Sequence, residues 1–403
     1  MSIIVQKYGG SSVADVGKLR YVAERVMQTA RQGHQVVVVV SAMGDTTDEL
    51  LAMAKQISPN PERRELDMLL SAGERISMAL LSLAIRDLGG DAISFTGSQS
   101  GIITNDHHVD ARIIEVRPFR VHDELPPGRI VVVGGYEGVS YKREVTTLGR
   151  GGSDTTAVGM AAALDAEYWE ICSDVDGVYS ADPRVVPAAT RIGTLSYEET
   201  QEMAEAGAKV LNAQAVEFAK EKGIAIYARA THGELPGSDP SSDGTVVRKS
   251  PPRMPGMVVG IASERDVLVL DSSAPPGDVL ALLAERRVPG KQLHVFDSRT
   301  TVAISRENLH DEGQLKEVLQ ARFGGRARVV DDLAAVSGIG AGINATYDNV
   351  LTGSATLAGA GIAPSGIATS SFRITWMVPG DRVKEAVRAL HEGFIEQQRP
   401  LVP

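Results

Sequence analysis

The sequence predicts an α/β chain in which a doubly wound, mostly parallel sheet is followed by two ferredoxin-like α+β modules. Two observations carry this prediction. Up to about residue 230, short apolar runs alternate with longer amphipathic stretches. Farther along, one order of strand and helix patterns occurs twice. A length of 403 residues exceeds one ordinary core, so we expect domains at 1–245, 259–330 and 331–403.

The predicted strands of the first domain are short and rich in β-branched residues. Several carry these residues on consecutive positions, which is typical of parallel strands covered on both faces. They occupy residues 3–5, 36–40, 92–95, 130–133, 170–171 and 224–228. Helical periodicity marks the segments between them, at 16–31, 45–56, 63–88, 153–164 and 197–222. In such folds ligands bind beyond the carboxyl ends of the strands.

A segment rich in Gly, Pro, Ser and Asp, residues 233–255, predicts the exit from this domain. The two repeats beyond it share the order strand, helix, strand, strand, helix, which indicates ferredoxin-like units. The first comprises 267–270, 276–287, 293–296, 301–304 and 312–323, and the second 334–339, 349–360, 367–369, 372–378 and 382–395. Such modules often bind small ligands where they pair, and a plain dimerisation surface accounts for them nearly as well. We expect a homo-oligomer.

Composition narrows the class of protein. A net charge of −10 without a long basic run argues against a nucleic-acid partner. We expect no signal peptide and no apolar stretch of membrane-spanning length, hence no membrane partner. The single cysteine, Cys172, leaves no internal disulfide and suits the reducing cytoplasm. The histidines lack the ligand spacing of a transition-metal site, and His107 and His108 are interpreted as part of a solvated loop.

Two glycine-rich segments carry the chemistry. Residues 7–12 follow the first predicted strand, and residues 148–156 open into a predicted helix. Glycines let the backbone turn tightly beside a ligand, and free amides at a helix start point at an anion. The first segment adds Lys7 and the second adds Arg150 and Asp154. Together they predict phosphoryl transfer.

Neither segment fits the commoner nucleotide fingerprints, because the chain has no G-x-x-x-x-G-K-[ST] and no strand followed by G-x-G-x-x-G. A lone Gly-Gly-Ser is more often a tight turn than a phosphate cradle, so two ordinary turns are the alternative interpretation. Charged neighbours at two strand-to-helix junctions favour the phosphate interpretation.

Five segments resemble those of the aspartate kinases, a branch of the amino-acid-kinase superfamily, in order and spacing. The C-terminal repeats resemble the tandem ACT domains of that family more loosely. The resemblance implies transfer of the ATP γ-phosphoryl group to the β-carboxylate of L-aspartate, the first step toward lysine, threonine and methionine. The segments are KYGGS at 7–11, SAMG at 41–44, SAGERI at 71–76, TTLGRGGSD at 146–154, and SDVDGVY at 173–179 with ADPR at 181–184.

The resemblance also assigns site residues. Lys7 and the amides of Gly9 and Gly10 would neutralise the transferring group, since a carboxylate attacking a triphosphate brings two anions together. Asp154 would orient Lys7 or help hold magnesium, and a helix N-cap is its structural alternative. Magnesium would arrive with ATP, without a dedicated metal site.

For the substrate, the resemblance implies that Glu74 binds the ammonium group and Arg150 the α-carboxylate, which a planar guanidinium grips in a bidentate manner. Ser41, Thr47 and Ser153 would complete the pocket, although residues 45–48 also suit a helix cap. For the nucleotide, the implied contacts are Lys7, Tyr8, Gly9, Gly10, Ser173, Asp174, Tyr179, Arg184 and Lys209.

Some segments depart from the family pattern. Asn212-Ala213-Gln214 stands where the family usually has a basic tripeptide. The effector loops of the ACT domains are replaced at 274–277, 288–293 and 345–349. Each lost contact to a buried effector group costs about 1–3 kcal/mol, so we expect weakened or altered amino-acid feedback. Another amino-acid or carboxylate kinase of the superfamily, and a non-catalytic regulatory subunit, remain as alternatives.

Overall fold

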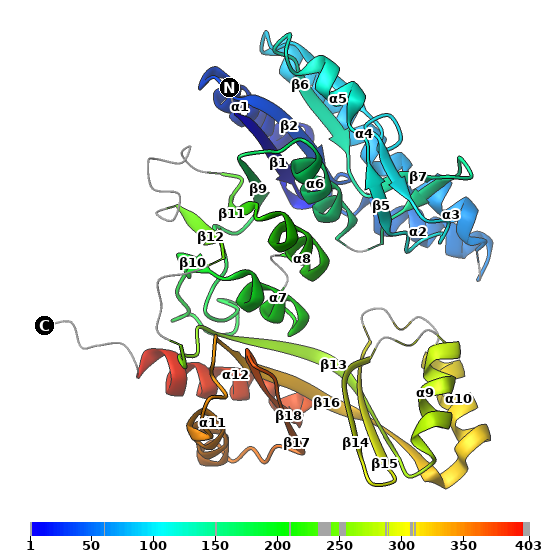
Figure 1. Ribbon diagram of the computed structural model, residues 1–403, viewed down its shortest axis with the longest axis vertical. Coiled ribbons are helices and arrows are strands. Elements are labelled where there is room, and N and C mark those ends of the chain that lie inside the picture. Colours follow the sequence, from blue (N-terminus) through cyan, green and yellow to red (C-terminus); the bar gives the residue numbers. More distant parts are fainter. Residues whose placement is uncertain are drawn as a thin grey trace, which may run out of the picture. The chain divides into compact units, whose positions relative to one another are not determined.

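The computed structural model describes residues 2–59, 61–149, 151–208, 211–232, 243–249, 255–286, 288, 290–306, 309 and 312–397. Residues group into two compact units (Figure 1). The N-terminal unit comprises Met1–Val178, Arg191–Ala204 and Lys209–Pro252. The C-terminal unit comprises Tyr179–Thr190, Glu205–Ala208 and Arg253–Pro403. The short segment Tyr179–Thr190 thus belongs with residues far along the chain.

The N-terminal unit is built on a mostly parallel sheet, as predicted. Its described strands are ordered β10-β12-β11-β9-β1-β2-β6-β3, and only β11 and β12 pair in the antiparallel direction. Val36 to Val40 of β2 are all buried, because helices cover both faces. The bounds are β1 Ile3–Tyr8, β2 Gln35–Val40, β3 Ala92–Phe95, β6 Ile130–Gly134, β9 Tyr168–Ser173, β10 Thr194–Leu195, β11 Ala225–Ala230 and β12 Gly244–Val247.

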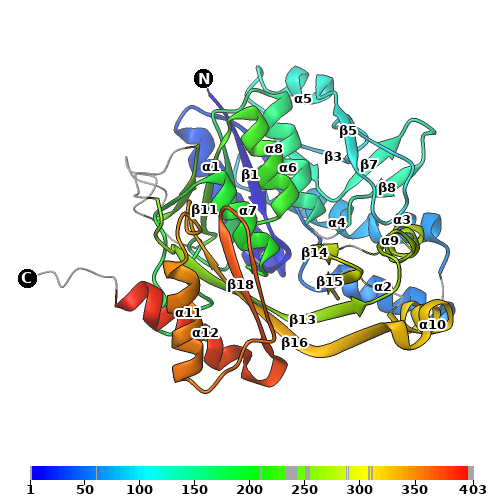
Figure 2. The same cartoon turned by 60° about the horizontal axis from the view of Figure 1, so that its bottom comes forward.

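Helices pack on the two faces of this sheet. On one face, α1 and α4 pack against alternate residues of β2, namely Val36, Val38 and Val40. On the other face, α6 contacts β1, β2 and β9, and α8 lies beside α6 (Figure 2). The bounds are η1 Gly10–Val13, α1 Val16–Arg31, α2 Thr46–Ile57, α3 Arg63–Leu70, α4 Ala72–Asp87, α5 Phe119–Glu124, α6 Gly152–Ala163, α7 Tyr197–Glu205 and α8 Ala213–Lys222.

Two long helical predictions are divided in the structure. The segment predicted at 63–88 forms α3 and α4, and the one at 197–222 forms α7 and α8. Together α3 and α4, Arg63–Asp87, are long and apolar enough to cross a membrane by length and composition, which the sequence reasoning did not anticipate. Leu81 and Ile85 of α4 are fully buried against the sheet, however. A core helix of a globular protein meets the same test.

The N-terminal unit also contains a small second sheet that was not predicted, ordered β5-β4-β7-β8. Its strands are only three or four residues long and mix polar with apolar residues, so their periodicity is too short to detect. The bounds are β4 Ile102–Thr104, β5 Ile113–Val116, β7 Glu137–Ser140 and β8 Val145–Thr147.

The C-terminal unit contains one antiparallel sheet, ordered β14-β15-β13-β16-β18-β17. In Figures 1 and 2, α9 and α10 lie at one end of the long β13 and β16 strands, and α11 and α12 at the other. The bounds are β13 Gly260–Ser272, α9 Pro276–Glu285, β14 Gly290–Phe296, β15 Arg299–Ser305, α10 Glu312–Phe323, η2 Gly324–Arg326, β16 Ala327–Ile339, α11 Asp348–Gly359, β17 Gly366–Thr369, β18 Arg373–Pro379, η3 Gly380–Arg382, α12 Val383–His391 and η4 Glu392–Glu396.

The two ferredoxin-like modules interlock through β13 and β16. Residues 267–272 of β13 pair with β15 and with the first half of β16, which completes the first module. Residues 260–264 pair instead with residues 335–339, beside β18 in the second module. The fourth strand of the second module therefore precedes the whole first module in sequence. The consecutive division expected at 259–330 and 331–403 does not anticipate this exchange.

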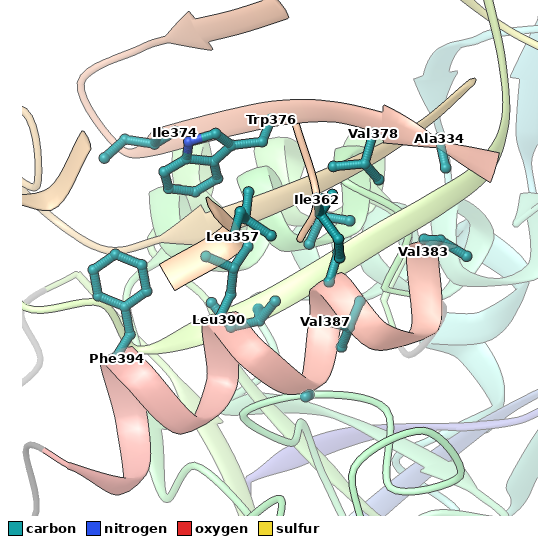
Figure 3. Close-up of a cluster of buried hydrophobic side chains, with 14 of the residues drawn as sticks. Ala334, Leu357, Ile362, Ile374, Trp376, Val378, Val383, Val387, Leu390 and Phe394 are labelled. Atoms are coloured by element: carbon teal, nitrogen blue, oxygen red, sulfur yellow. The ribbon is translucent and has the colours of Figure 1, made fainter. Parts of the chain in front are cut away.

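The larger core of the C-terminal unit surrounds Trp376, which is fully buried (Figure 3). In the figure, Leu390 of α12 and Phe394 of η4 point toward β18, the strand that carries Trp376. Val185, from the segment Tyr179–Thr190, joins the same core, and its carbonyl accepts a hydrogen bond from Arg388 Nε at 2.9 Å. These contacts explain why that segment belongs to the C-terminal unit.

Candidate active site

Segments that follow the parallel strands converge at one edge of the large sheet. Gly10, after β1, lies so close to the loop after β2 that a Cβ there would be 2.9 Å from the Ala42 carbonyl oxygen. Gly135, after β6, would place a Cβ 2.7 Å from that of Ser153 in α6. Gly73 in α4 would place one 2.7 Å from the Ala42 Cβ. Glycines therefore permit these segments to meet.

Lys7 and Asp154 form an ion pair at this edge. Lys7 Nζ lies 2.6 Å from Asp154 Oδ1, and the two side chains are 12% and 11% exposed. The ammonium group is also close to the first glycine turn, because a Cβ on Gly9 would lie 3.7 Å from it. The Gly9 amide donates to the Cys172 carbonyl at a long distance of 3.5 Å. A cation beside the backbone amides of a glycine turn is suited to a phosphate group.

The N-terminus of α6 carries the second glycine turn. Gly151, with φ +74°, is the N-cap residue, and no side chain caps this helix. Asp154 lies in the first turn and contacts Lys7, so the N-cap alternative for Asp154 is wrong. Asn212, where the family usually has a basic residue, caps α8, and a Cβ on Gly151 would lie 2.2 Å from its amide nitrogen.

Glu74 is a buried carboxylate with unused hydrogen-bonding capacity. It is 3% exposed, and its Oε1 accepts a hydrogen bond from the Ala42 amide at 3.0 Å. Within the described part of the chain, its buried Oε2 has no hydrogen-bond partner. Burial raises the pKa of this carboxyl group to about 7, although the hydrogen bond from the Ala42 amide lowers it in part. A bound ammonium group would satisfy both the oxygen and the charge.

Two serines lie beside these groups. The hydroxyl groups of Ser41 and Ser153 are 2.8 Å apart, and Ser77 Oγ donates to the Ser41 carbonyl at 2.7 Å. Thr47 lies in the first turn of α2 and is half-buried. Asp45 occupies the N-cap position of α2, as the alternative interpretation of residues 45–48 predicts. Its side chain, however, makes no capping hydrogen bond.

The predicted nucleotide residues are more dispersed. Ser173 ends β9, where its hydroxyl group bonds within the turn to Val175, and Asp174 is exposed. Tyr8 is fully buried, and burial raises the pKa of its hydroxyl group well above the ordinary value. Its ring is therefore part of the core, and the predicted nucleotide contact of Tyr8 is left to its backbone.

Four other predicted residues have different outcomes. Tyr179 and Arg184 belong to the C-terminal unit, where Arg184 is 86% exposed and pairs with Asp182 at 2.9 Å. Arg150 and Lys209 lie outside the described residues.

One buried contact between titratable side chains, His108 and Asp67, was not predicted from the sequence. His108, expected in a solvated loop, has its Nδ1 2.5 Å from Asp67, a fully buried carboxylate. These residues are 41 positions apart, and no local pattern connects them.

The described residues contain no cluster of three or more His, Cys, Asp or Glu side chains that could hold a metal ion.

Comparison with known proteins agrees with this geometry. The amino acid kinase family model matches residues 2–228. An aspartokinase of Mycolicibacterium smegmatis is 45% identical over 412 residues, covering 98% of this chain and 96% of the relative. An aspartokinase of Corynebacterium glutamicum is 41% identical with the same coverage.

Solved structures of aspartokinase III from E. coli also match over nearly the whole chain. The structure in complex with aspartate and ADP, in the R-state, has a TM-score of 0.84 and 25% identity, covering 97% of this chain and 99% of that one. The T-state structure with lysine and aspartate has a TM-score of 0.74 and 26% identity, covering 98% and 99%. The chain therefore belongs to the amino acid kinase family and, within that family, to the aspartokinases.

Proposed function

We propose that this protein is an aspartate kinase, which transfers the γ-phosphoryl group of MgATP to the β-carboxylate of L-aspartate and gives 4-phospho-L-aspartate and ADP. One observation carries the proposal. The Lys7–Asp154 ion pair and the incompletely bonded Glu74 lie on segments that meet at one sheet edge. One group suits a phosphate and the other suits the ammonium group of an α-amino acid.

The reaction assigns a role to each part of the edge. A β-carboxylate oxygen attacks the γ-phosphorus, and the bond from that phosphorus to the β–γ bridging oxygen breaks. Lys7, held by Asp154, and the Gly9 and Gly10 amides stabilise the negative charge on the transferring group. Magnesium would enter with ATP as part of the substrate, and its charge would add to that of Lys7.

The substrate pocket would hold aspartate at three points. Glu74 binds the ammonium group through Oε2, and Arg150 grips the α-carboxylate. The hydroxyl groups of Ser41 and Ser153, already in contact, donate to the substrate, and Thr47 borders it. Proximity of this kind converts a reaction between two anions into one within a single complex.

The nucleotide would be bound by the turn after β9 and by segments beyond it. Ser173 and Asp174 contact the ribose or adenine region, Tyr179 and Arg184 the base and phosphates, and Lys209 the phosphates. These assignments rest on the resemblance of the segments that carry the residues.

Assembly and regulation complete the proposal. We propose a cytoplasmic homo-oligomer that pairs through the ACT-like modules. Because its effector loops depart from the family pattern, lysine and threonine at millimolar levels should inhibit by less than half at subsaturating aspartate. Stronger inhibition would show that these loops still bind the effectors, through backbone groups.

One assay tests the activity. Purified protein is incubated with MgATP and aspartate, and with a panel of other amino acids and carboxylic acids, and the acyl phosphate product is trapped and quantified. Aspartate should be the preferred substrate. Preference for another acid would favour the alternative kinase, and absence of all turnover would favour a regulatory subunit.

The pocket assignment has its own test. Arg150→Lys keeps the charge but loses the bidentate geometry, so the aspartate KM should rise about tenfold while the ATP KM stays nearly constant. A selective rise in the ATP KM would place Arg150 on the phosphate side instead.

A further inference from the structure

Asp67 is a charged residue on the buried face of α3. It is 0% exposed and lies between Leu66 and Leu70, which are buried on the same helix. A fully buried carboxylate is costly unless it is hydrogen-bonded. Nothing in the proposed reaction uses Asp67, so its retention inside the unit requires another account.

The Asp67 carboxylate accepts three hydrogen bonds. Its Oδ1 accepts from the Val109 amide at 3.0 Å and from Thr147 Oγ1 at 2.6 Å. Its Oδ2 accepts from His108 Nδ1 at 2.5 Å. Two of these donors belong to the loop between β4 and β5, and the third ends β8. A single side chain thus joins three elements.

The loop that Asp67 holds has an unfavourable backbone conformation. Val109 has φ +72°, a region that β-branched residues rarely adopt. Surrounding contacts must maintain such a conformation, and the bond from the Val109 amide to Asp67 is one of them. Another bond, from the Ala111 amide to the Thr147 carbonyl at 2.9 Å, ties the loop to the end of β8.

The same loop packs against the glycine-rich segment that leads into α6. A Cβ on Gly149 would lie 3.4 Å from the Val109 carbonyl oxygen and 3.2 Å from Asp110 Oδ1. Gly149 directly precedes Arg150, and its carbonyl accepts a hydrogen bond from the Gly152 amide at 3.0 Å. A shift of the loop would therefore displace Gly149 and, through its bond with Gly152, the start of α6 that carries Ser153.

We propose that Asp67 is a positioning residue for aspartate binding. Through Val109 and Thr147 it fixes the loop and the end of β8, and these fix the glycine turn without any contact between Asp67 and the substrate. The proposal rests on the proposed function, in which Arg150 binds the α-carboxylate. Small displacements in such a pocket have large effects on binding.

Variants of decreasing severity test it. Asp67→Ala leaves the Val109 amide without its acceptor, and the aspartate KM should rise about thirtyfold or more. Thr147→Val removes one donor at nearly constant shape, and a rise of about fivefold is expected. Asp67→Asn keeps Oδ1 and should restore most of the affinity lost in Asp67→Ala. In every case the ATP KM should change by less than about twofold, and Glu65→Gln on the exposed face of α3 is the matched control.

A double-mutant cycle shows whether the effect passes through Arg150. If Asp67 acts on aspartate binding through the glycine-rich segment, Thr147→Val should raise the aspartate KM less in an Arg150→Lys background than alone. Equal effects in both backgrounds would overturn the proposal. So would a parallel rise of both KM values, because it would indicate general loss of structure.

Hydrogen exchange separates failure of this inference from failure of the proposed function. Asp67→Ala should accelerate exchange of the amides in residues 107–112 and 148–152, whatever the substrate is. If Asp67→Ala fails to fold, Thr147→Val is measured in its place. Unchanged exchange in both segments overturns the positioning role. If exchange is faster but the separate Arg150→Lys variant keeps a normal aspartate KM, the positioning role stands and the substrate assignment of the proposed function is wrong.

Discussion

Glu74 and Glu170 are buried in the same unit to the same degree, 3% and 2% exposed, yet their surroundings differ. Glu170 Oε1 accepts from Arg25 at 3.1 Å and from Arg229 at 2.9 Å, and Oε2 accepts from Gln6 at 2.7 Å. Burial alone would raise the pKa of Glu170, but the two guanidinium groups bring it below the ordinary value. Glu74 has no such cation among the described residues, and its pKa rises to about 7.

The difference separates a structural carboxylate from a binding one. Every requirement of Glu170 is met by the protein itself, so it contributes to the fold whether or not a ligand is bound. Glu74 leaves its charge and one oxygen unsatisfied, which destabilises the free protein and favours a cationic ligand. Incomplete bonding of a buried group is therefore the more informative sign of a binding site.

The largest expected effect is on the structural side of this comparison. Glu170→Gln removes the carboxylate that Arg25 and Arg229 share and leaves Arg229 with Asp243 Oδ1 at 3.5 Å, and breaking such a buried pair costs about 3–5 kcal/mol. Urea unfolding followed by Trp169 fluorescence, in a Trp376→Phe background, reports on the N-terminal unit alone, since these are the only two tryptophans. The exposed neighbour Glu167→Gln is the control, and an equal response from both variants would contradict the structural role.

Next in size is the loss of Lys7 from the binding side. Lys7→Met should lower turnover about a hundredfold or more, since removing one preorganised charge from a transition state costs about 3 kcal/mol or more. Circular dichroism should be unchanged, because the ammonium group is at the sheet edge. Lys55→Met, on the exposed face of α2, serves as control. Near-normal turnover of Lys7→Met would remove the lysine from the mechanism.

Glu74→Gln should stabilise the free protein while abolishing tight aspartate binding. A raised pKa means that the folded state binds more protons than the unfolded state between about pH 4.5 and 7, so stability falls as pH rises through that window. At pH 8 the amide should raise the unfolding free energy by about 1–3 kcal/mol, and below pH 4 the gain should vanish. A loss of stability at pH 8 would show that the carboxylate is satisfied after all.

The smallest effect concerns pH. Aspartate binding needs ionised Glu74, so below pH 7 the ligand must displace a proton from it. The aspartate KM should rise by up to about tenfold per pH unit as the pH falls below 7, while the ATP KM stays flat. Initial rates between pH 5.5 and 8.5 measure this, with Glu74→Gln as the reference that lacks the slope. A flat wild-type profile would contradict the assignment of Glu74 to the ammonium group.

Elements with a strong local pattern were predictable from sequence. The run at 92–95 and the helix at 16–31 match β3 and α1, because periodicity and β-branching decide those segments locally. The short strands of the second sheet could not be predicted in this way, because each of them is stabilised by pairing with the others rather than by a local pattern. The break at Ser71 between α3 and α4 was likewise hidden by continuous helical periodicity.

The candidate site shows the same limit. Residue types and glycine spacing pointed to Lys7 and Asp154, which the structure brings together, and the family resemblance pointed to Glu74. Alternation along β1 does not reveal that the Tyr8 ring is buried, because β1 is a central strand with buried side chains on both faces. The Asp67 network, assembled from three distant segments, has no local signature at all.

The strand exchange between the two ferredoxin-like modules has a consequence for how the chain folds. Residues 260–264 leave the ribosome early, but their partners at 335–339 follow about 70 residues later. The first module can form while the strand that precedes it still has an unpaired edge. Closing that long loop delays folding of the second module. A nascent chain released near residue 330 would expose residues 260–264 as an unpaired strand edge that can pair with other chains. We therefore expect such truncated chains to depend on chaperones more than the full chain does.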